Sequence, residues 1–401
     1  MQTLSQSWIR ATLLFALILG LAAFIPQELR AQSFSVLHTF TGGPSDGASP
    51  FAGIVLDTSG NAYGMTDFGG SGLWCPSGCG IVFKVSISGQ VSVLHNFSGN
   101  NKDGAYPVYN SLMIERGNGY GTTWEGGTFG AGTIFKVTAT GQERVLYNFT
   151  GAADGGFPYG GLIHDSAGNL YGTTSERGSG TSCPYGCGTV FKLDATHKIT
   201  VLHSFLGGTA DGAFPLAGVI RDSSGNLYGT TLAGGTYNLG TIFKIDSSGN
   251  ETVLYNFSGP DGMTPWGGLL RDGAGNLYGT TFSGGDFGSS GTVFKLGTNG
   301  TITLLHNFLY GDAASPTGSL IRDSSGNLYG TTLLGGSYGV GTVFKLDAKG
   351  NETILYSFTY SSDGGLPYGS LARDSAGNLY GTTNQGGDPI CLCGTVFKIT
   401  P

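Results

Sequence analysis

Gly225-Asn226-Leu227-Tyr228-Gly229-Thr230-Thr231 is the stretch that decides the fold, because the chain carries seven versions of it. Each version keeps Asn two residues before the tyrosine, Gly directly after it and Thr three residues after it. The tyrosines are Tyr63, Tyr120, Tyr171, Tyr228, Tyr278, Tyr329 and Tyr380. A unit that returns every 50–57 residues indicates an array of one supersecondary element.

Each unit contains four runs that are typical of strands. In the fourth unit they are Pro215–Asp222, Asn226–Thr231, Gly240–Ile245 and Glu251–Phe257, which we name strands a to d. They are rich in Val, Ile, Thr, Tyr and Phe and are separated by Gly, Asp and Ser, so each joint is read as a hairpin. Four antiparallel strands per unit, repeated seven times without a helix, predict an all-β, seven-bladed β-propeller.

The ends of the chain predict that the ring is closed. Residues 32–401 form one propeller with blades at about 50–97, 107–149, 158–205, 215–257, 265–308, 316–358 and 367–400 plus 33–40. The repeats begin with a strand d and end on a strand c, so residues 33–40 are expected to supply the outer strand of the last blade. Such closure leaves no open sheet edge. An open solenoid, the alternative, would need polar capping units, which the repeats lack.

Spacing separates the two faces of this ring. The strand-a proline lies 13 residues before the tyrosine in all seven units, whereas the tyrosine lies 16 to 21 residues before the strand-c lysine. The a–b and c–d hairpins therefore form a constant face, and the b–c and d–a connections form a variable face. Variation between repeats commonly maps to the binding face.

The b–c loops contain aromatic residues that we predict to form a ligand-binding face. Aromatic rings stack on apolar ligand surfaces while polar neighbours orient the ligand. The alternative is that these rings shield one another over the glycine-rich loops. The candidates are Phe68, Trp74, Trp124, Phe129, Tyr185, Tyr237, Phe282, Phe287 and Tyr338.

Other repeated residues are interpreted as scaffold. The tyrosines are expected to fill space between blades, and Gly-Asn to supply positive φ at a turn. An aspartate four residues before each strand-a proline is expected to cap a turn. A shared Ca²⁺ site is the alternative, but aspartates on separate blades cannot all approach one ion to about 2.3–2.6 Å. We therefore predict no metal and no cofactor.

One position of strand d is occupied by either of two residue types. It holds His38, His95, His203 and His306 in four units and Tyr147, Tyr255 and Tyr356 in the others. Free exchange of His and Tyr suits a packed amphipathic ring rather than a general base.

The six cysteines occur only in the three longest b–c loops. An exported chain with six cysteines favours disulfides, and local pairing is the simplest of the possible arrangements, although the tightest pair would be strained. No histidine lies in those loops, which disfavours a metal site. The six candidates form three local pairs, of which Cys75 with Cys79 and Cys183 with Cys187 are expected, whereas strain argues against the tight ring that Cys391 and Cys393 would close.

The N-terminus is typical of an export signal. Arg10 precedes a 15-residue apolar run, 11–25, and Ala31 offers a small residue before a cut at Gln32. This run is short for a membrane span, although an uncleaved anchor is the alternative. We expect residues 1–31 to be a signal peptide, with no transmembrane segment after cleavage and an extracellular, periplasmic or cell-surface location.

The sequence resembles the GloVer tandem-repeat family of exported bacterial proteins. The resemblance covers about residues 33–401 and rests on Gly-Asn-x-Tyr-Gly-x-Thr, Gly-Thr-Val-Phe-Lys and Val-Leu-His-x-Phe. Members often carry a C-terminal surface anchor, and this sequence shows none after its last repeat. Strands a and b are also similar to NHL-type propeller repeats. The resemblance implies no particular activity.

These observations predict a secreted, monomeric, non-catalytic propeller that binds a glycan or protein on its variable face. A net charge of −7 without a basic stripe argues against nucleic acid as a partner. A propeller enzyme of the lactonase or lyase type is one alternative, and it would need polar groups that converge near the axis. Early strand-a positions are small, however, apart from the amide of Asn110. A purely structural envelope or matrix protein is the other alternative.

Overall fold

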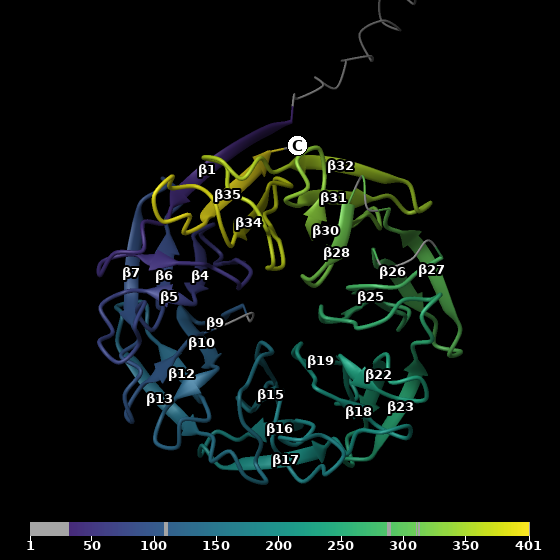
Figure 1. The fold of residues 1–401 in the computed structure, drawn as a ribbon. Helices are drawn as coiled ribbons and strands as arrows, with labels where there is room; N and C mark the ends of the chain where they lie inside the picture. Colours follow the sequence, from purple (N-terminus) through teal and green to yellow (C-terminus); the bar gives the residue numbers. More distant parts are fainter. Residues whose placement is uncertain (1–31, 108–110, 287–289, 310, 312, 401) are drawn as a thin grey trace, which may run out of the picture. The chain divides into compact units, whose positions relative to one another are not determined.

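The computed structural model describes residues 32–107, 111–286, 290–309, 311 and 313–400, so the predicted signal peptide lies outside the described residues. Residues Phe34–Thr400 form one compact unit, in which seven β-sheets surround a central axis (Figure 1). The seven-bladed propeller predicted from the repeats is therefore confirmed. Within the described part of the chain, no helix has the length and apolar character needed to cross a membrane.

Each blade has four strands, ordered from the axis outward. Blades 1 and 2 contain β3 (Val55–Leu56), β4 (Ala62–Thr66), β6 (Ile81–Val85) and β7 (Val91–Asn96), then β9 (Met113–Glu115), β10 (Asn118–Thr123), β12 (Thr133–Val137) and β13 (Glu143–Asn148). Blades 3 and 4 contain β14 (Ile163–His164), β15 (Leu170–Thr174), β16 (Thr189–Leu193) and β17 (Ile199–Ser204), then β19 (Ile220–Arg221), β20 (Leu227–Thr231), β22 (Thr241–Ile245) and β23 (Glu251–Asn256).

The remaining blades repeat this order. Blades 5 and 6 contain β24 (Leu270–Arg271), β25 (Leu277–Thr281), β26 (Thr292–Leu296) and β27 (Ile302–Asn307), then β29 (Ile321–Arg322), β30 (Leu328–Gly335), β31 (Thr342–Leu346) and β32 (Glu352–Ser357), with β28 (Ala313–Pro316) also paired to β30. Blade 7 contains β33 (Ala372–Arg373), β34 (Leu379–Thr383), β35 (Thr395–Thr400) and β1 (Ser33–Thr39).

The first strand of the chain closes the ring. β1 lies beside β35 as the outer strand of blade 7, so the two ends of the described chain share one sheet (Figure 1). The Phe40 N–H donates a 3.0 Å hydrogen bond to the Gly394 carbonyl just beyond this pairing. The predicted closure is therefore present.

The innermost strand is shorter than the sequence predicts. Strand a of the fourth unit was expected over Pro215–Asp222, but only Ile220–Arg221 is strand. The residues before it are small, and their backbones pack against the equivalent segment of a neighbouring blade. A Cβ on Gly160 would lie 2.4 Å from the Gly218 nitrogen. Close inter-blade packing thus replaces the strand ladder near the axis.

A phenylalanine of strand c explains why glycine follows each repeated tyrosine. Gly229 lies directly opposite Phe243 in the ladder between β20 and β22. A Cβ on Gly229 would lie 2.5 Å from the Phe243 Cζ, and the six equivalent glycines face their own strand-c phenylalanine in the same way. The ring therefore occupies the space that a side chain would need on the neighbouring strand.

The same phenylalanines join each blade to the previous one. Each strand-c ring meets the phenylalanine that follows strand d of the preceding blade, edge to face, with centroids 5.1–5.3 Å apart. These are aromatic geometries favoured by the ring quadrupoles. The pairs are Phe40–Phe83, Phe97–Phe135, Phe149–Phe191, Phe205–Phe243, Phe257–Phe294, Phe308–Phe344 and Phe358–Phe397.

The repeated tyrosine lies between blades, and its hydroxyl belongs to the a–b turn. Tyr171 of blade 3 packs with Leu227 and Phe243 of blade 4. The Arg221 guanidinium lies over the Tyr171 ring, 5.8 Å from its centroid. Strand-c lysines of the same blade lie over four of the tyrosines, 5.4–5.7 Å from the ring centroids, which is a cation–π arrangement.

A carboxylate organises the a–b turn of six blades. In blade 3, Asp165 Oδ1 accepts hydrogen bonds from the Ala167 and Asn169 N–H groups, and Oδ2 accepts from the Asn169 amide at 2.7 Å and the Tyr171 hydroxyl at 2.9 Å. The turn glycine has positive φ, as Gly168 does at 79°. The asparagine does not, so its function is to donate to the aspartate.

Threonines of the repeat also bind the next blade. The Thr230 hydroxyl donates to the Gly267 carbonyl at 3.2 Å, and the Thr382 hydroxyl donates across the closure of the ring to the Ala52 carbonyl at 2.8 Å. These bonds satisfy carbonyl groups of the inner segments that lack strand partners. The motif therefore supplies both the packing and the hydrogen bonds of the blade interface.

We predict that Gly229→Ala destabilises the fold through overpacking against Phe243. Inserting a methyl group into a filled site costs about 1–3 kcal/mol, which urea unfolding would detect. The matched control is Gly273→Ala, because Gly273 has ordinary φ and nothing within 4 Å of an added Cβ. Equal stability of the two variants would contradict the assigned function of the Tyr-Gly pair.

We predict that the a–b turn makes stability depend on pH in the acid range. Burial alone would raise the pKa of Asp165, but hydrogen bonds from Asn169, Tyr171 and Ala167 lower it to about 2. The unfolded value is about 3.9, so the contribution to stability is complete above that pH and is lost as pH falls toward 2. The stability difference between the native chain and Asp165→Asn should therefore be constant from pH 5 to 7 and shrink below pH 4. A difference that stays constant to pH 2 would count against this assignment.

Candidate functional site

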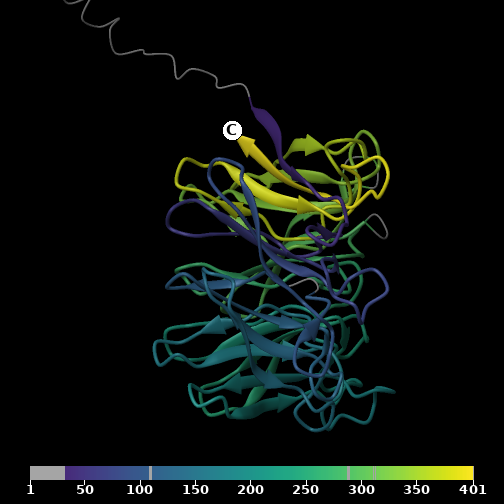
Figure 2. The ribbon, with the colours of Figure 1, turned by 90° about the vertical axis from the view of Figure 1, so that its left-hand side faces the viewer.

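The b–c and d–a connections lie on one face of the ring. Figure 2 shows the ring from its edge, so that its two faces lie to the left and right. Short ladders join them in three blades: β2 (Gly47–Ala48) with β5 (Phe68–Gly69), β8 (Gly104–Ala105) with β11 (Glu125–Gly126), and β18 (Gly212–Ala213) with β21 (Ala233–Gly234). The loops whose lengths vary between repeats are therefore hydrogen-bonded to each other at their bases. This variable face is the candidate binding surface.

Five of the nine predicted aromatic residues are exposed on this face. Their side chains are between 59% and 75% exposed, and each stands on the b–c loop of a different blade. We call this set the crown: Trp74, Phe129, Tyr185, Tyr237 and Tyr338. Phe287, on the corresponding loop of blade 5, lies outside the described residues.

Three other candidates are half-buried, because each packs against an aromatic ring of a d–a connection or of the segment that follows it. The ring centroids are 5.2–5.7 Å apart. The pairs are Phe68 with Tyr106, Trp124 with Phe157, and Phe282 with Trp266. Mutual shielding, the alternative considered from the sequence, therefore describes these three residues, which support the base of the loops.

Exposed apolar side chains are concentrated on the variable face. Eleven large hydrophobic residues are exposed in the described part of the chain. Ten of them lie in b–c or d–a connections, and Ile87 in a c–d turn is the exception. The five that join the crown on this face are Leu73, Leu206, Leu309, Ile390 and Leu392. Concentrated exposed apolar surface is a feature of interaction sites, so this face is the candidate surface for binding.

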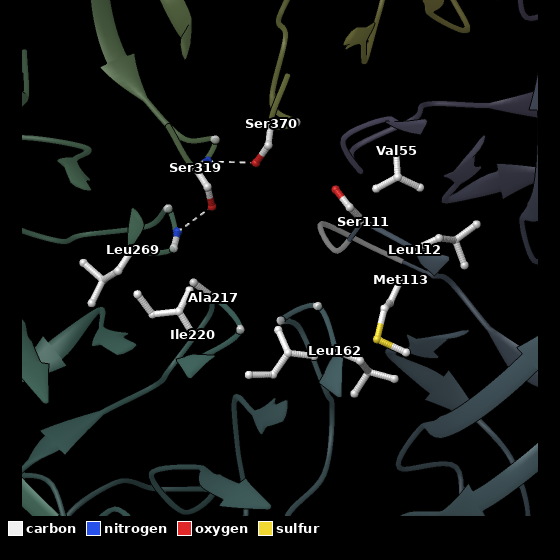
Figure 3. Close-up of a pocket in the computed structure, with 18 of the residues that line it drawn as sticks. Val55, Ser111, Leu112, Met113, Leu162, Ala217, Ile220, Leu269, Ser319 and Ser370 are labelled. Atoms are coloured by element: carbon white, nitrogen blue, oxygen red, sulfur yellow. Dashed lines mark hydrogen bonds between the residues drawn. The ribbon is translucent and has the colours of Figure 1, made fainter. Parts of the chain in front are cut away.

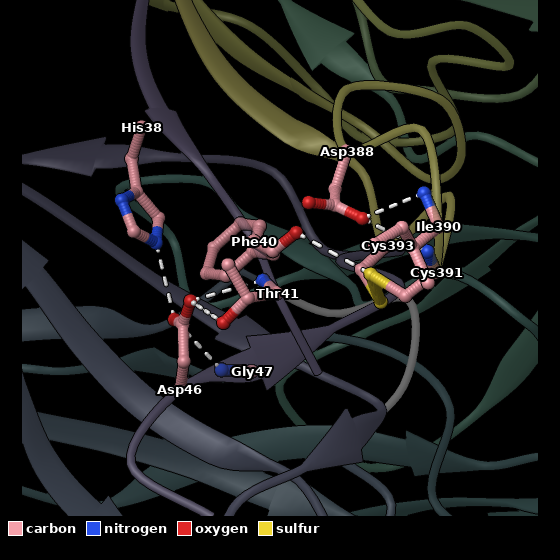
Figure 4. Close-up of a disulfide and its surroundings, with 9 residues drawn as sticks. All are labelled: His38, Phe40, Thr41, Asp46, Gly47, Asp388, Ile390, Cys391 and Cys393. Atoms are coloured by element: carbon pink, nitrogen blue, oxygen red, sulfur yellow. Dashed lines mark hydrogen bonds and ion pairs between the residues drawn. A yellow bond between two sulfur atoms is a disulfide. The ribbon is translucent and has the colours of Figure 1, made fainter. Parts of the chain in front are cut away.

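Disulfides constrain the three longest b–c loops. The pairs are Cys75–Cys79, Cys183–Cys187 and Cys391–Cys393, and each closes within its own loop. Trp74 and Tyr185 are therefore carried by cross-linked loops, as are Ile390 and Leu392. The Cys391 sulfur lies 3.6 Å from the Phe40 carbonyl oxygen, where blade 7 meets the strand that closes the ring (Figure 4).

A cavity of about 490 Å³ lies at the axis, between the inner segments of the blades. Its lining is mainly glycine, leucine and isoleucine, with a few hydroxyls (Figure 3). Ser319 Oγ accepts a 2.9 Å hydrogen bond from the Gly268 N–H, and Ser370 Oγ accepts one of 2.8 Å from the Ser319 N–H. Among the described lining residues, the Tyr368 phenol is the only ionisable side chain, and burial raises its pKa. Asn110 lies outside the described residues.

One buried carboxyl group on the variable face escaped the sequence-based prediction. Asp67 is 7% exposed, and its Oδ1 has no hydrogen-bond partner among the described residues. Burial, and then the charge of Glu125, raise the pKa of Asp67 to about 7. Its charge is the signal that could have revealed it, because the other six blades carry an uncharged residue at this position: Trp124, Ser175, Leu232, Phe282, Leu333 and Asn384.

The aspartates of the d–a connections cap their turns. Asp46 accepts hydrogen bonds from the Thr41 and Gly47 N–H groups at 3.0 and 2.9 Å, and His38 Nε2 lies 3.1 Å away (Figure 4). Burial alone would raise the pKa of Asp46, but His38 and these donors lower it. In three blades a tyrosine hydroxyl donates to the equivalent aspartate in place of histidine. Both residue types serve this carboxylate, which explains their exchange.

Fold and site together define a closed seven-bladed propeller built from one repeated unit, with a constant frame and a variable apolar face. The chain belongs to the Gloeobacter/Verrucomicrobia repeat family, whose model matches residues 27–205 and 179–397. This membership agrees with the resemblance seen in the repeat motifs.

Many solved structures are similar to this chain in fold, among them the following two. Virginiamycin B lyase from Staphylococcus aureus has 14% identity and a TM-score of 0.59, and the match covers 92% of this chain and 100% of that one. PorZ, a surface component of the type-IX secretion system of Porphyromonas gingivalis, has 15% identity and a TM-score of 0.53, with coverage of 89% and 47%. At these identities the likeness shows the fold alone. No curated protein sequence matches the chain.

Proposed function

We propose that this protein is an exported, non-catalytic propeller that binds a macromolecular ligand, a glycan or a protein, through its variable face. The observation that carries the proposal is the one-sided distribution of exposed apolar side chains, of which ten of eleven in the described chain lie on that face. Burying such side chains against a partner removes apolar surface from water.

The distribution of the crown favours a large ligand. Its members stand on five separate blades, so a partner that touches several of them must extend across the ring. The exposed aliphatic residues Leu73 and Ile390 favour a protein partner, because aliphatic side chains stack poorly on sugar rings. The aromatic members favour either class.

Export is supported by the three disulfides, since such bonds persist mainly in oxidising compartments. The apolar segment 11–25 supports it as well, although it lies outside the described residues. A location outside the cytoplasm would also bring the variable face into contact with extracellular glycans and surface proteins.

Catalysis is the second candidate, and one observation favours it. Asp67 is a buried carboxyl group whose pKa is raised to about 7, a state that suits a general acid or base. The axial cavity argues against this alternative, because the lining that the structure describes supplies no charged side chain. Turnover that is lost in Asp67→Asn would favour the enzyme.

We predict that replacing Trp74, Phe129 and Tyr185 together by alanine abolishes binding without unfolding the protein. Aromatic hot spots at interfaces contribute about 2 kcal/mol or more each, so the loss of three should lower affinity by a factor of about 10⁴. Ligands would be found on a glycan array and a peptide array, and the affinity of the best one measured by calorimetry.

The matched control for this experiment is Ile87→Ala, because Ile87 is 79% exposed but belongs to the opposite face. It should leave binding unchanged. The melting temperature of the triple variant should stay near that of the native chain, since these side chains are exposed. A triple variant that binds normally would overturn the proposal. A triple variant that unfolds would show that the crown residues stabilise the fold, which would also contradict the proposal.

A further inference from the structure

Two clusters of metal-ligating side chains lie between neighbouring blades. His95 and Asp103 of blade 1 meet Glu143 of blade 2, and His203 and Asp211 of blade 3 meet Glu251 of blade 4 in the same way. In each cluster, one imidazole nitrogen and one oxygen from each carboxylate all lie within 4.8 Å of one another. We call these the His–Asp–Glu clusters.

Hydrogen bonds hold the aspartate and the histidine of each cluster in place. His95 Nε2 lies 3.3 Å from both carboxylate oxygens of Asp103, which also accepts hydrogen bonds from the Ser98 and Gly104 N–H groups at 2.7 and 2.8 Å. The His95 and Asp103 side chains are only 17% and 12% exposed. The ligand atoms are therefore positioned before any ion arrives.

The third member lacks a partner. Glu143 Oε1 and Glu251 Oε1 are buried and have no hydrogen-bond partner among the described residues. A buried carboxylate oxygen without a donor is unfavourable. A cation between the glutamate, the aspartate and the imidazole would satisfy this oxygen.

The sequence couples the histidine to the glutamate across blades. Where strand d carries His95, His203 or His306, the first residue of strand d in the next blade is Glu143, Glu251 or Glu352. Where it carries Tyr147, Tyr255 or Tyr356, the corresponding residue is Ile199, Ile302 or Phe34. Each tyrosine packs with its apolar partner, and Phe34 stacks on Tyr356 with centroids 3.8 Å apart. A ligand set therefore alternates with an apolar pair around the ring.

Two positions limit this pattern. His38 faces Val91 rather than a glutamate, so the interface between blades 7 and 1 lacks the third ligand. His306 and Glu352 approach to 3.3 Å, but Asp312, the aspartate of that connection, lies outside the described residues.

We propose that each His–Asp–Glu cluster binds one divalent transition-metal ion, with Zn²⁺ as its best probe. Zinc takes imidazole nitrogen at about 2.0–2.1 Å and carboxylate oxygen at about 2.0–2.2 Å, which sets tetrahedral ligand atoms about 3.3–3.5 Å apart. The separation of His95 Nε2 from Asp103 matches this edge, and a small movement of Glu143 completes a three-ligand site with an open fourth position. Ca²⁺ would not suit the cluster, because it takes 6–8 oxygen ligands.

The ion would cross-link adjacent blades beneath the variable face. The histidine lies near the end of strand d, the aspartate lies in the d–a connection that follows, and the glutamate belongs to the next blade. Binding would therefore connect two blades that are otherwise joined by packing, and it would stabilise the folded state by mass action.

Zinc content of variants tests the proposal. Untagged protein is equilibrated with Zn²⁺, washed by gel filtration and analysed by elemental mass spectrometry, with affinity measured by calorimetry. His95→Tyr/Glu143→Ile transplants the Tyr147–Ile199 pair of the next interface, and His203→Tyr/Glu251→Ile does the same for the second cluster. Each double variant should bind one zinc ion fewer per chain than the native protein, and the combination should bind two fewer.

Two further variants make the result specific. His38→Tyr changes a histidine whose interface lacks the glutamate, so its zinc content should equal that of the native protein. Glu143→Gln keeps the volume of the side chain and should lower affinity for one ion at least tenfold even if the double variants fold poorly. Zinc should raise the melting temperature of the native chain but not that of the combined variant. Native protein without bound zinc, or equal zinc content in the native and combined variants, would overturn the proposal.

Discussion

The edge-to-face contact between phenylalanines of neighbouring blades is the interaction on which the rest of this structure depends. Every blade gives its strand-c ring to one contact and the ring after strand d to the next, so seven identical contacts complete the circle. The strand-c ring also requires glycine on the facing strand, as Gly229 shows beside Phe243. Because packed interiors tolerate little change in volume, this contact accounts for the constant length of the c–d hairpin, whose two phenylalanines both take part in it.

The interface between blades varies at its outer end, where either of two residue types accompanies the aspartate of the d–a connection. The described aspartates of the d–a connections lie beside either an imidazole or a phenol, as Asp103 does with His95 Nε2 and Asp154 with the Tyr147 hydroxyl. In six interfaces the residue of the neighbouring blade matches this choice: an apolar residue such as Ile199 covers a tyrosine ring, whereas a glutamate such as Glu143 accompanies the more polar imidazole. The exception is His38, which faces Val91. Covariation within a single sequence thus reports contacts between repeats.

Much of the fold could be predicted from the sequence, because its determinants are local and repeated. The number of blades and the closure by residues 33–40 follow from spacing. Local pairing of the cysteines was expected for two loops, but the Cys391–Cys393 disulfide forms although strain argued against it. The shortness of strand a and the shielding of Trp124 by Phe157 could not be predicted, since both depend on which backbones and rings meet in space. Asp67 was missed for a different reason. Its position differs between the repeats, and the prediction rested on residues that the repeats share.

The same division explains why the apolar surface lies on the variable face. On the constant face, turn carboxylates such as Asp165 accept hydrogen bonds from Asn169 and Tyr171, and basic side chains lie over tyrosine rings. The polar groups of that face are therefore used in contacts that stabilise the fold. The tips of the b–c loops do not carry these repeated scaffold contacts. Where they are long, a disulfide holds residues such as Trp74 and Tyr185 in a restricted set of positions. These loops can therefore vary in length and still present a defined surface. Under the proposed function, restricting a contact residue before binding would lower the entropy lost on association.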